Sequence, residues 1–179
     1  MTLSIRSMAR CGLLAALVAA GAFIRVPVPF MDYFTLQFFF VMLAGILLGC
    51  RKGAVAVAVY VVLGLVGLPI FAAGGGPAYV FRPSFGYLIG FIAAAALTGK
   101  LSEGRQDYKS VLLACLAGFA VTYAIGIAYK YMILNVYANT PATLAVVVLS
   151  CFPLDMPGDL ILCLLAPVVG LRIRKGIEQ

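Results

Sequence analysis

Six apolar runs follow one another along this chain of 179 residues, and they constrain its fold more than any other feature. Hydrophobic residues make up 64% of the chain and charged residues only 11%. This composition lies far from that of a water-soluble domain and is typical of a protein that crosses a membrane several times. We therefore predict an all-α integral membrane protein that forms one domain over residues 1–179.

The six apolar runs are predicted to be six transmembrane helices, separated by prolines, glycines and charges. They cover residues 11–24, 34–49 (starting at 34 or 35), 53–68, 84–98, 110–133 and 159–171. Residues 26–33 contain two prolines and are expected to form an extended turn, and residues 50–53 a tight basic turn. A further apolar stretch, 142–151, is too short for a ~30 Å core, which takes ~20 helical residues, so we expect a partial helix there.

The first run follows two arginines, Arg6 and Arg10, and so resembles the start of a secretory signal peptide. The many apolar runs after it favour a first membrane span instead. Ala15 and Ala19 are four residues apart within it, as are Ala16 and Ala20, and this spacing lets a second helix approach closely. Ala15 and Ala19 are therefore candidate contacts for a partner helix, with packing inside the protein as the alternative.

The formal charge of +7 comes from thirteen Lys and Arg residues that stand singly or in pairs between apolar runs. They form no continuous basic patch, so we do not expect nucleic acid as a partner. Their distribution predicts membrane topology, because basic residues accumulate on the cytoplasmic side. If both termini are cytoplasmic, ten of the thirteen lie inside, and only three lie outside: Arg25, Arg82 and Lys130.

Two broken segments, 68–83 and 151–158, then fall on the same outer side. Prolines and the run of three glycines, Gly74 to Gly76, stop a helix from continuing through the first of them. Lipid cannot hydrogen-bond an irregular backbone, so such a segment is buried in protein, lines a cavity or lies at the interface. An ordinary external loop is the simpler alternative to a binding site.

Polar residues inside the apolar runs are the candidates for a binding function. A carboxylate within a spanning helix is disfavoured by ~2.5–3.5 kcal/mol, so Asp159 requires a partner or a ligand. We expect it at the N-terminus of the last helix, where free N–H groups favour an anion, and a simple helix cap is the alternative. Gln37 is the strongly polar residue of its run and requires a partner on another helix or in a cavity.

Residues that would indicate catalysis or metal binding are scarce. The chain has no histidine, and its five cysteines include no CxxC pair, so we expect neither a metal site nor a cofactor. An intramembrane enzyme would have to rely on Asp155 and Asp159, which are only four residues apart. A channel is another alternative. The sequence has no phosphate-binding loop, so energy from ATP would have to come from other chains.

Three patches of the sequence together resemble a known family. They are Phe34-Thr35-Leu36-Gln37 with residues 43–49, the stretch 64–71 continuing through the glycines to 83–91, and Pro157-Gly158-Asp159-Leu160-Ile161. They resemble the BioY family, the biotin-specific substrate-binding (S) subunits of energy-coupling-factor (ECF) vitamin transporters, over nearly the whole chain. The resemblance implies a six-helix subunit of the bacterial plasma membrane that captures external biotin and is not an enzyme. It also implies partners, a transmembrane coupling subunit (EcfT-like) and two ATP-binding-cassette subunits (EcfA-like). The coupling subunit would dock on the small residues of the first helix.

The resemblance also implies roles for individual residues. Asp159 matches the aspartate that accepts the ureido N–H groups of biotin, whereas the lysine that usually follows three residues later is Leu162 here. Gly75 of the glycine-rich loop is also a candidate ligand contact, although this loop offers only backbone groups, whereas the family often has a polar residue there.

From the residues themselves, a biotin pocket needs acceptors, apolar walls and a cation. Asp159 and Gln37 are candidates for the first, and Arg82 or Lys130 for the third. The candidates for the apolar walls are Tyr79, Phe81, Phe85 and Tyr87. An S subunit for thiamin or riboflavin remains the alternative.

Overall fold

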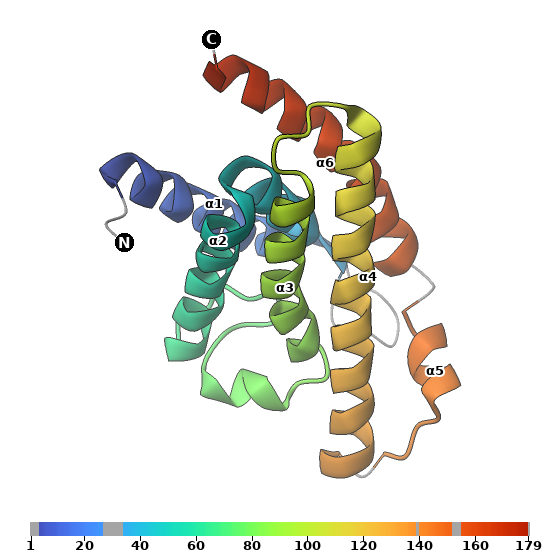
Figure 1. Cartoon of the computed structure of the whole chain (residues 1–179). Coiled ribbons are helices and arrows are strands. Elements are labelled where there is room, and N and C mark those ends of the chain that lie inside the picture. Colours follow the sequence, from blue (N-terminus) through green and yellow to red (C-terminus); the bar gives the residue numbers. More distant parts are fainter. Residues whose placement is uncertain (1–3, 27–33, 139, 152–154, 179) are drawn as a thin grey trace.

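The computed structural model describes residues 4–26, 34–138, 140–151 and 155–178, and most of them are helical (Figure 1). Two strands form a short antiparallel ribbon in which Arg25 lies opposite Thr35. The predicted proline turn at 26–33 lies, from residue 27 onward, outside the described residues. The elements are α1 (Ile5–Phe23), β1 (Arg25–Val26), β2 (Phe34–Thr35), α2 (Gln37–Val66), the 3-10 helix η1 (Pro77–Phe81), α3 (Phe85–Leu101), α4 (Tyr108–Met132), the π-helical turn η2 (Ile133–Tyr137), α5 (Leu144–Leu149) and α6 (Asp155–Glu178).

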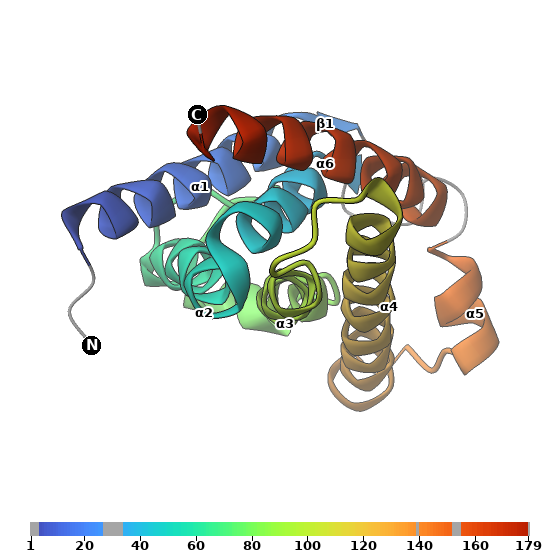
Figure 2. The same ribbon diagram turned by 45° about the horizontal axis from the view of Figure 1, so that its top comes forward.

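Helix α2 contains two of the predicted spans and bends sharply between them. Gly49 has φ 78° and ψ −179°, a backbone region that is accessible almost only to glycine. The light-blue and teal halves of α2 consequently run in different directions (Figure 2). The prediction of a separate basic turn at 50–53 was wrong, because these residues are helical and the break lies at Gly49.

The number of apolar helical segments agrees with the predicted six: α1, the two halves of α2, α3, α4 and α6. Within the described chain, 4 helical stretches are long and apolar enough to cross a membrane, and α3 is a shorter apolar helix. The broken segment at 68–83 is confirmed as non-α, with only η1 within it. The stretch at 142–151 forms the six-residue helix α5, which confirms a partial helix beside α4.

The start of α6 differs from the prediction. The helix begins at Asp155 and not at Asp159, so the expected break over 155–158 was wrong. Pro157 is the third residue of the helix, where the missing N–H removes no intrahelical hydrogen bond. Asp159 therefore lies in the second turn, and its predicted position at the helix N-terminus is corrected accordingly.

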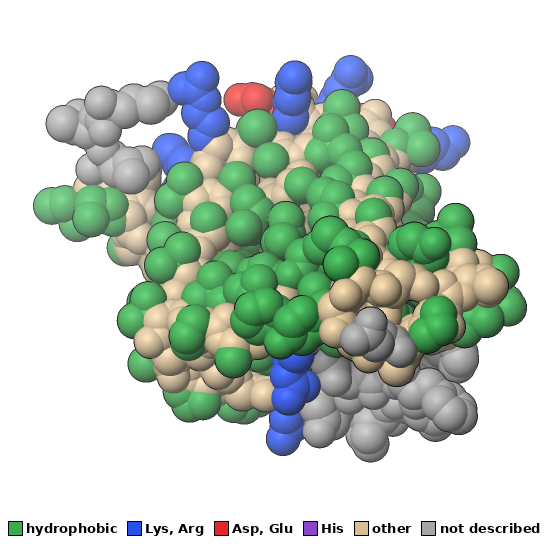
Figure 3. All heavy atoms as spheres, turned by 90° about the horizontal axis from the view of Figure 1, so that it is seen from below, with side chains coloured by type: hydrophobic (Ala, Val, Ile, Leu, Met, Phe, Trp, Pro, Cys, Tyr) green, Lys and Arg blue, Asp and Glu red, His purple; other side chains and the backbone are tan. Residues whose placement is uncertain are grey.

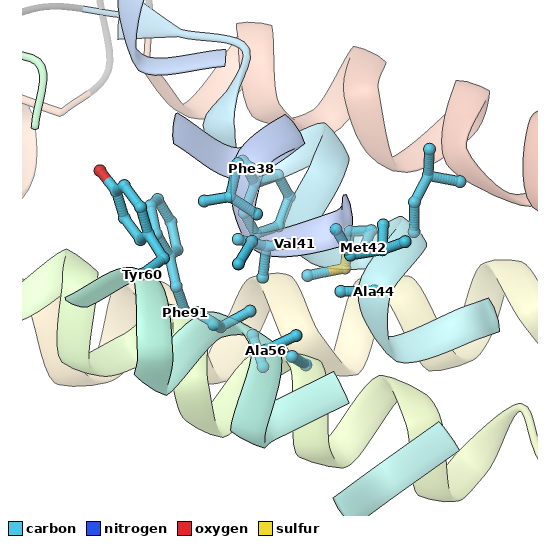
Figure 4. Close-up of a cluster of buried hydrophobic side chains, with 14 of the residues drawn as sticks. Phe38, Val41, Met42, Ala44, Ala56, Tyr60 and Phe91 are labelled. Carbon is cyan, nitrogen blue, oxygen red and sulfur yellow. The ribbon is translucent and has the colours of Figure 1, made fainter. Parts of the chain in front are cut away.

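The buried core is centred on α2, which packs against α1 and α3, while α6 lies across α2 and α4. Figure 4 shows side chains from both halves of α2 meeting there, with Phe91 of α3 beside them. The labelled residues of this cluster are Phe38, Val41, Met42, Ala44, Ala56, Tyr60 and Phe91, and all are less than 9% exposed. The core holds the ends of α2 and α3 that carry the pocket described below.

The loop between α3 and α4 lies at the same end of the helix bundle as the C-terminus (Figure 1). There a hydrogen bond from the Ser110 side chain, together with the 2.8 Å hydrogen bond that the Ser110 N–H donates to Oδ2, lowers the pKa of the Asp107 carboxylate below the ordinary value of 3.8. Seen from the opposite end, the surface is mostly hydrophobic, and the Lys and Arg side chains in view lie mainly at its edge (Figure 3).

The guanidinium of Arg174 links α6 to α2 and to the loop between α3 and α4. Its Nε donates to the Ile46 carbonyl at 2.9 Å, near the break in α2. Its Nη1 donates to the carbonyls of Ser102 at 3.0 Å and Arg105 at 2.9 Å, just after α3. Arg174 thus supplies hydrogen bonds to carbonyls at or near helix ends, where intrahelical donors run out.

Candidate functional site

A pocket of about 630 Å³, counting its open mouth, lies between the start of α2, α3, α4 and the first turns of α6. Its walls are contributed by residues from every major element except α1 and α5: Phe34, Thr35, Gln37, Phe38, Ala72, Tyr79, Ser84, Tyr87, Leu88, Phe91, Tyr123, Asp155 and Asp159.

Aromatic rings form most of the pocket wall. Tyr79 of η1 is 6% exposed and lies against Phe71, with 4.6 Å between ring centroids. Tyr87 and Tyr123 meet edge to face at 5.6 Å across the contact between α3 and α4. Phe91 is buried and tilted against Phe38. Rings held by such neighbours offer rigid apolar surface to a ligand, and the tyrosine hydroxyls add polar atoms.

Two carboxylates lie at the α6 side of the pocket. Asp159 is 9% exposed, and its Oδ2 accepts a 2.9 Å hydrogen bond from the hydroxyl of Tyr123. Asp155 precedes it by one helical turn, which brings both side chains to the same face. The Oδ1 atom of Asp155 is buried and has no hydrogen-bond partner among the described residues.

Gln37 lines the pocket, but its amide also makes hydrogen bonds within the protein. Its Oε1 accepts from the Thr35 hydroxyl at 3.1 Å, and its Nε2 donates to the Tyr60 hydroxyl. Tyr60 in turn donates to the carbonyl of Ile70 at 3.2 Å. This chain of hydrogen bonds joins β2, both halves of α2 and the loop at 67–76, so Gln37 holds the pocket wall together.

Of the nine predicted ligand-binding residues, four line the pocket: Asp159, Gln37, Tyr79 and Tyr87. The other five do not: Arg82, Gly75, Lys130, Phe81 and Phe85. Arg82 is exposed, with its guanidinium carbon 5.4 Å from the centroid of the Tyr79 ring. Its position is thus next to the pocket wall.

Gly75 and Lys130 have other surroundings. A Cβ at Gly75 would overlap the carbonyl oxygen of Leu68, so a glycine is required there by close packing of the loop. Lys130 is 8% exposed, and its Nζ donates to the hydroxyl of Ser150 at 2.8 Å.

Several pocket residues were not predicted, and Tyr123, Phe91 and Asp155 are the most informative. Tyr123 follows Thr122 within an otherwise apolar helix, a polar pair that would have been a usable signal. Asp155 precedes Asp159 by four residues, and that spacing would have indicated a shared face if the helix had been extended. Phe91 carries no such signal, because its helix is apolar on all sides.

The small residues that are exposed on helix α1 are not the two that were predicted to contact a partner helix. Ala15 is 7% exposed and packs in the core, and Ala19 is half-buried. The exposed small residues, also four apart, are Gly12, Ala16 and Ala20. An exposed face for a partner helix therefore includes Ala16 and Ala20 and leaves out Ala15.

No metal site is evident in the described part of the chain. Its His, Cys, Asp and Glu side chains nowhere form a group of three or more that would hold a metal ion. The polar groups that line the pocket are carboxylates, hydroxyls and the amide of Gln37, which suit hydrogen bonds to an organic ligand.

Known proteins resemble this chain over nearly its full length. A protein from Lysinibacillus sphaericus, named probable biotin transporter BioY, is 40% identical over 171 residues, covering 94% of this chain and 87% of that protein. The biotin transporter BioY of Thermotoga maritima is 36% identical over 171 residues, covering 95% of this chain and 96% of that protein.

The fold is also similar to a solved structure, the crystal structure of the S-component for biotin from an ECF-type ABC transporter. The TM-score is 0.84 at 27% identity, and the match covers 98% of this chain and 95% of that one. The family model described as the BioY family matches residues 1–179. A whole-length family match, two relatives above 30% identity and the same fold agree with the resemblance of the sequence patches, and this chain belongs to the BioY family.

Proposed function

We propose that this chain is the biotin-capturing S-component of an ECF-type transporter. The observation that carries the proposal is the pocket, in which aromatic walls lead to the buried carboxylate of Asp159. Biotin combines a urea with two N–H donors, an apolar thioether ring, an aliphatic chain and a carboxylate. The names of the relatives, biotin transporter and S-component for biotin, support the same ligand.

The ureido ring of biotin faces α6 in the proposed complex. The carboxylate of Asp159 accepts a ureido N–H, because an ionised carboxylate is a strong and pure acceptor. Tyr123 holds this carboxylate in place through its 2.9 Å hydrogen bond. The thioether ring and chain then pack on Tyr79, Tyr87 and Phe91, which line the pocket.

The carboxylate of biotin points toward the pocket mouth, where we assign it to Arg82. The support for this assignment is that Arg82 lies over the Tyr79 ring, and a guanidinium suits a carboxylate. We assign no ligand contact to Gly75, which packs closely within its loop, or to Lys130, which donates a hydrogen bond to Ser150. Leu162, in the position of the family's lysine, is 6% exposed in the core and does not line the pocket.

Calorimetric titration of the purified protein in detergent tests the ligand. We expect tight, stoichiometric binding of biotin without ATP, and no comparable binding of thiamin or riboflavin. Asp159→Asn should weaken biotin binding by at least ~10-fold, since a charge-assisted hydrogen bond becomes a neutral one. The matched control is Asp107→Asn, at an exposed helix cap, which should bind as the wild type does. Binding of another vitamin in place of biotin would retain the S-component fold and reject biotin as the substrate.

Transport requires partners in this proposal: a transmembrane coupling subunit and ABC ATPases. We propose that the coupling subunit docks on the α1 face that contains Gly12, Ala16 and Ala20, since small exposed residues let a helix approach closely. Ala16→Leu should then reduce co-purification of the partners and leave biotin binding intact. Ala124→Leu is the matched control, because Ala120, Ala124 and Ala128 form a similar exposed row on α4. Equal losses in both variants would reject α1 as the docking face.

The proposed location is the bacterial plasma membrane with both termini in the cytoplasm. The support is the sequence, because ten of the thirteen Lys and Arg residues lie in the segments that this orientation places inside, as the positive-inside rule expects. Green fluorescent protein fused to the C-terminus should fluoresce in cells, whereas an exported C-terminus would leave it dark.

A further inference from the structure

The carboxylate of Asp155 is a polar group in the pocket that the proposed binding mode leaves unused. It lines the pocket together with Asp159, one helical turn away on α6. Asp159 has Tyr123 as a donor, whereas the buried Oδ1 of Asp155 has no partner in the described part of the protein. Buried polar atoms nearly always have a hydrogen-bond partner, so an unpartnered acceptor on a pocket wall indicates a donor on the ligand.

The charges around Asp155 do not explain it as half of an ion pair. Lys130 attracts its carboxylate electrostatically, but the Lys130 Nζ is directed to the Ser150 hydroxyl at 2.8 Å. No salt bridge joins Lys130 and Asp155 within the described ranges, and neither Lys nor Arg is among the residues that line the pocket. The α6 side of the pocket therefore combines two carboxylates with hydroxyl groups and has no cation in contact.

We propose that Asp155 is a second ligand acceptor, and that Asp155 and Asp159 each accept one N–H of the cyclic urea. This inference rests on the proposed function and specifies how the ureido ring is recognised. The two N–H bonds of a cyclic urea diverge from each other, so one acceptor cannot take both linearly. Side chains four residues apart on a helix have Cβ atoms ~5–6 Å apart, which suits two acceptors on either side of one small ring.

A pocket end built from two carboxylates favours positive charge on the ligand. In 2-iminobiotin a guanidinium replaces the urea, and this group keeps both ring N–H donors while adding a cation at neutral pH. Carboxylates pair strongly with guanidinium groups. The protein should therefore bind 2-iminobiotin at least as tightly as biotin, and this preference should depend on Asp155.

The test is calorimetric titration of the full-length protein with biotin and with 2-iminobiotin at pH 7. We expect Asp155→Asn to weaken biotin binding by at least ~10-fold and 2-iminobiotin binding by a larger factor, since one charged acceptor is lost. Asp107→Asn serves as the matched control. Asp155→Asn is nearly isosteric, and size-exclusion profiles and thermal unfolding check that it folds.

Lys130→Met and the double variant Lys130→Met/Asp155→Asn separate a ligand contact from a counter-charge. A ligand contact predicts that Asp155→Asn weakens binding to the same extent in both backgrounds. If the effect disappears in the Lys130→Met background, Asp155 only balances Lys130 and the proposal is overturned.

Two results distinguish this inference from the proposed function. If the wild type binds biotin tightly but Asp155→Asn binds both compounds unchanged, or the wild type rejects 2-iminobiotin, the second acceptor is wrong and biotin capture stands. The second of these results needs no variant, so it applies even if Asp155→Asn does not fold. If the wild type binds neither biotin nor 2-iminobiotin, the proposed function itself fails.

Discussion

The position of the Asp159 side chain depends on two other residues, Tyr123 and Gly158. Tyr123 donates to its Oδ2, which partly satisfies a buried carboxylate. Gly158, the preceding residue, has no side chain, and a Cβ there would overlap the ring of Phe34, another pocket residue. The pocket wall and the acceptor thus depend on each other: the ring of Phe34 fits only because the residue before Asp159 is a glycine.

Tyr123→Phe should reduce both stability and ligand binding. The change leaves the Oδ2 of Asp159 without its donor, and a buried unsatisfied polar group costs ~1–3 kcal/mol of the free energy of unfolding. Biotin affinity should fall by about 10-fold, because the carboxylate loses the contact that orients it. Thermal unfolding and calorimetry measure the two effects.

Tyr108→Phe is the matched control for this variant. The Tyr108 hydroxyl is partly exposed and donates to the Leu164 carbonyl at 3.2 Å, away from the pocket. Its loss should change stability by less than ~0.5 kcal/mol. Equal effects of the two substitutions would show that the hydroxyl of Tyr123 has no special role.

From the sequence, candidates for the binding site could be chosen where a residue conflicts with lipid. Asp159 and Gln37 stand out because a carboxylate and an amide are costly in a membrane, and the structure has both on the pocket wall. Phe91 and Leu88 could not be found in this way. An apolar residue suits lipid, core and pocket equally well, so its position on a spanning helix does not reveal which of them it faces.

At the scale of whole elements, the main departures from the prediction are the position of the break within α2 and the start of α6. Arg51 and Lys52 indicate a turn because they are charged, yet they are helical and exposed. The break lies at Gly49, whose backbone conformation other residues rarely adopt. In α6, Pro157 and Gly158 indicate a loop by composition, but a proline is tolerated in a first helical turn.

Gly49→Ala should destabilise the protein by ~1–3 kcal/mol, the usual cost of holding a non-glycine residue in this backbone region. The cause is purely conformational, because a Cβ at Gly49 would meet no atom within 4 Å. Thermal unfolding in detergent measures the effect.

Gly12→Ala provides the opposite comparison for Gly49→Ala. Gly12 is exposed within α1 and also has open space around an added Cβ. Alanine is favoured over glycine inside a helix by ~0.5–1 kcal/mol, so this variant should be slightly more stable than the wild type. A stabilising effect of both substitutions would mean that α2 is not strained at Gly49.

At the scale of the whole molecule, the apolar runs determined the number of helices, and their arrangement depends on contacts that the sequence does not display. Arg174 illustrates this, because by sequence it is one of several cations that follow the last span. In the structure it bonds carbonyls from α2 and from the loop after α3, 128 and 72 residues away. Such long-range contacts could not be predicted from charge patterning.

Arg174→Ala should lower the free energy of unfolding by ~2–4 kcal/mol, because it leaves several partly buried carbonyls without donors. Arg174→Lys should restore only part of this loss, since an ammonium lacks the planar fork that reaches several acceptors at once. Arg172→Ala, at an exposed position two residues earlier, should have little effect. Thermal unfolding of the three variants decides, and similar losses in Arg172→Ala and Arg174→Ala would point to net charge as the cause.

The aromatic wall of the pocket also gives the protein an optical property. The chain contains no tryptophan, so its near-ultraviolet emission comes from its nine tyrosines. Tyr79, Tyr87 and Tyr123 all line the pocket, and the hydroxyl of Tyr123 is bonded to a carboxylate there. A third of the tyrosines therefore line the pocket, so a change in tyrosine fluorescence would report that a ligand occupies the pocket, without any added label.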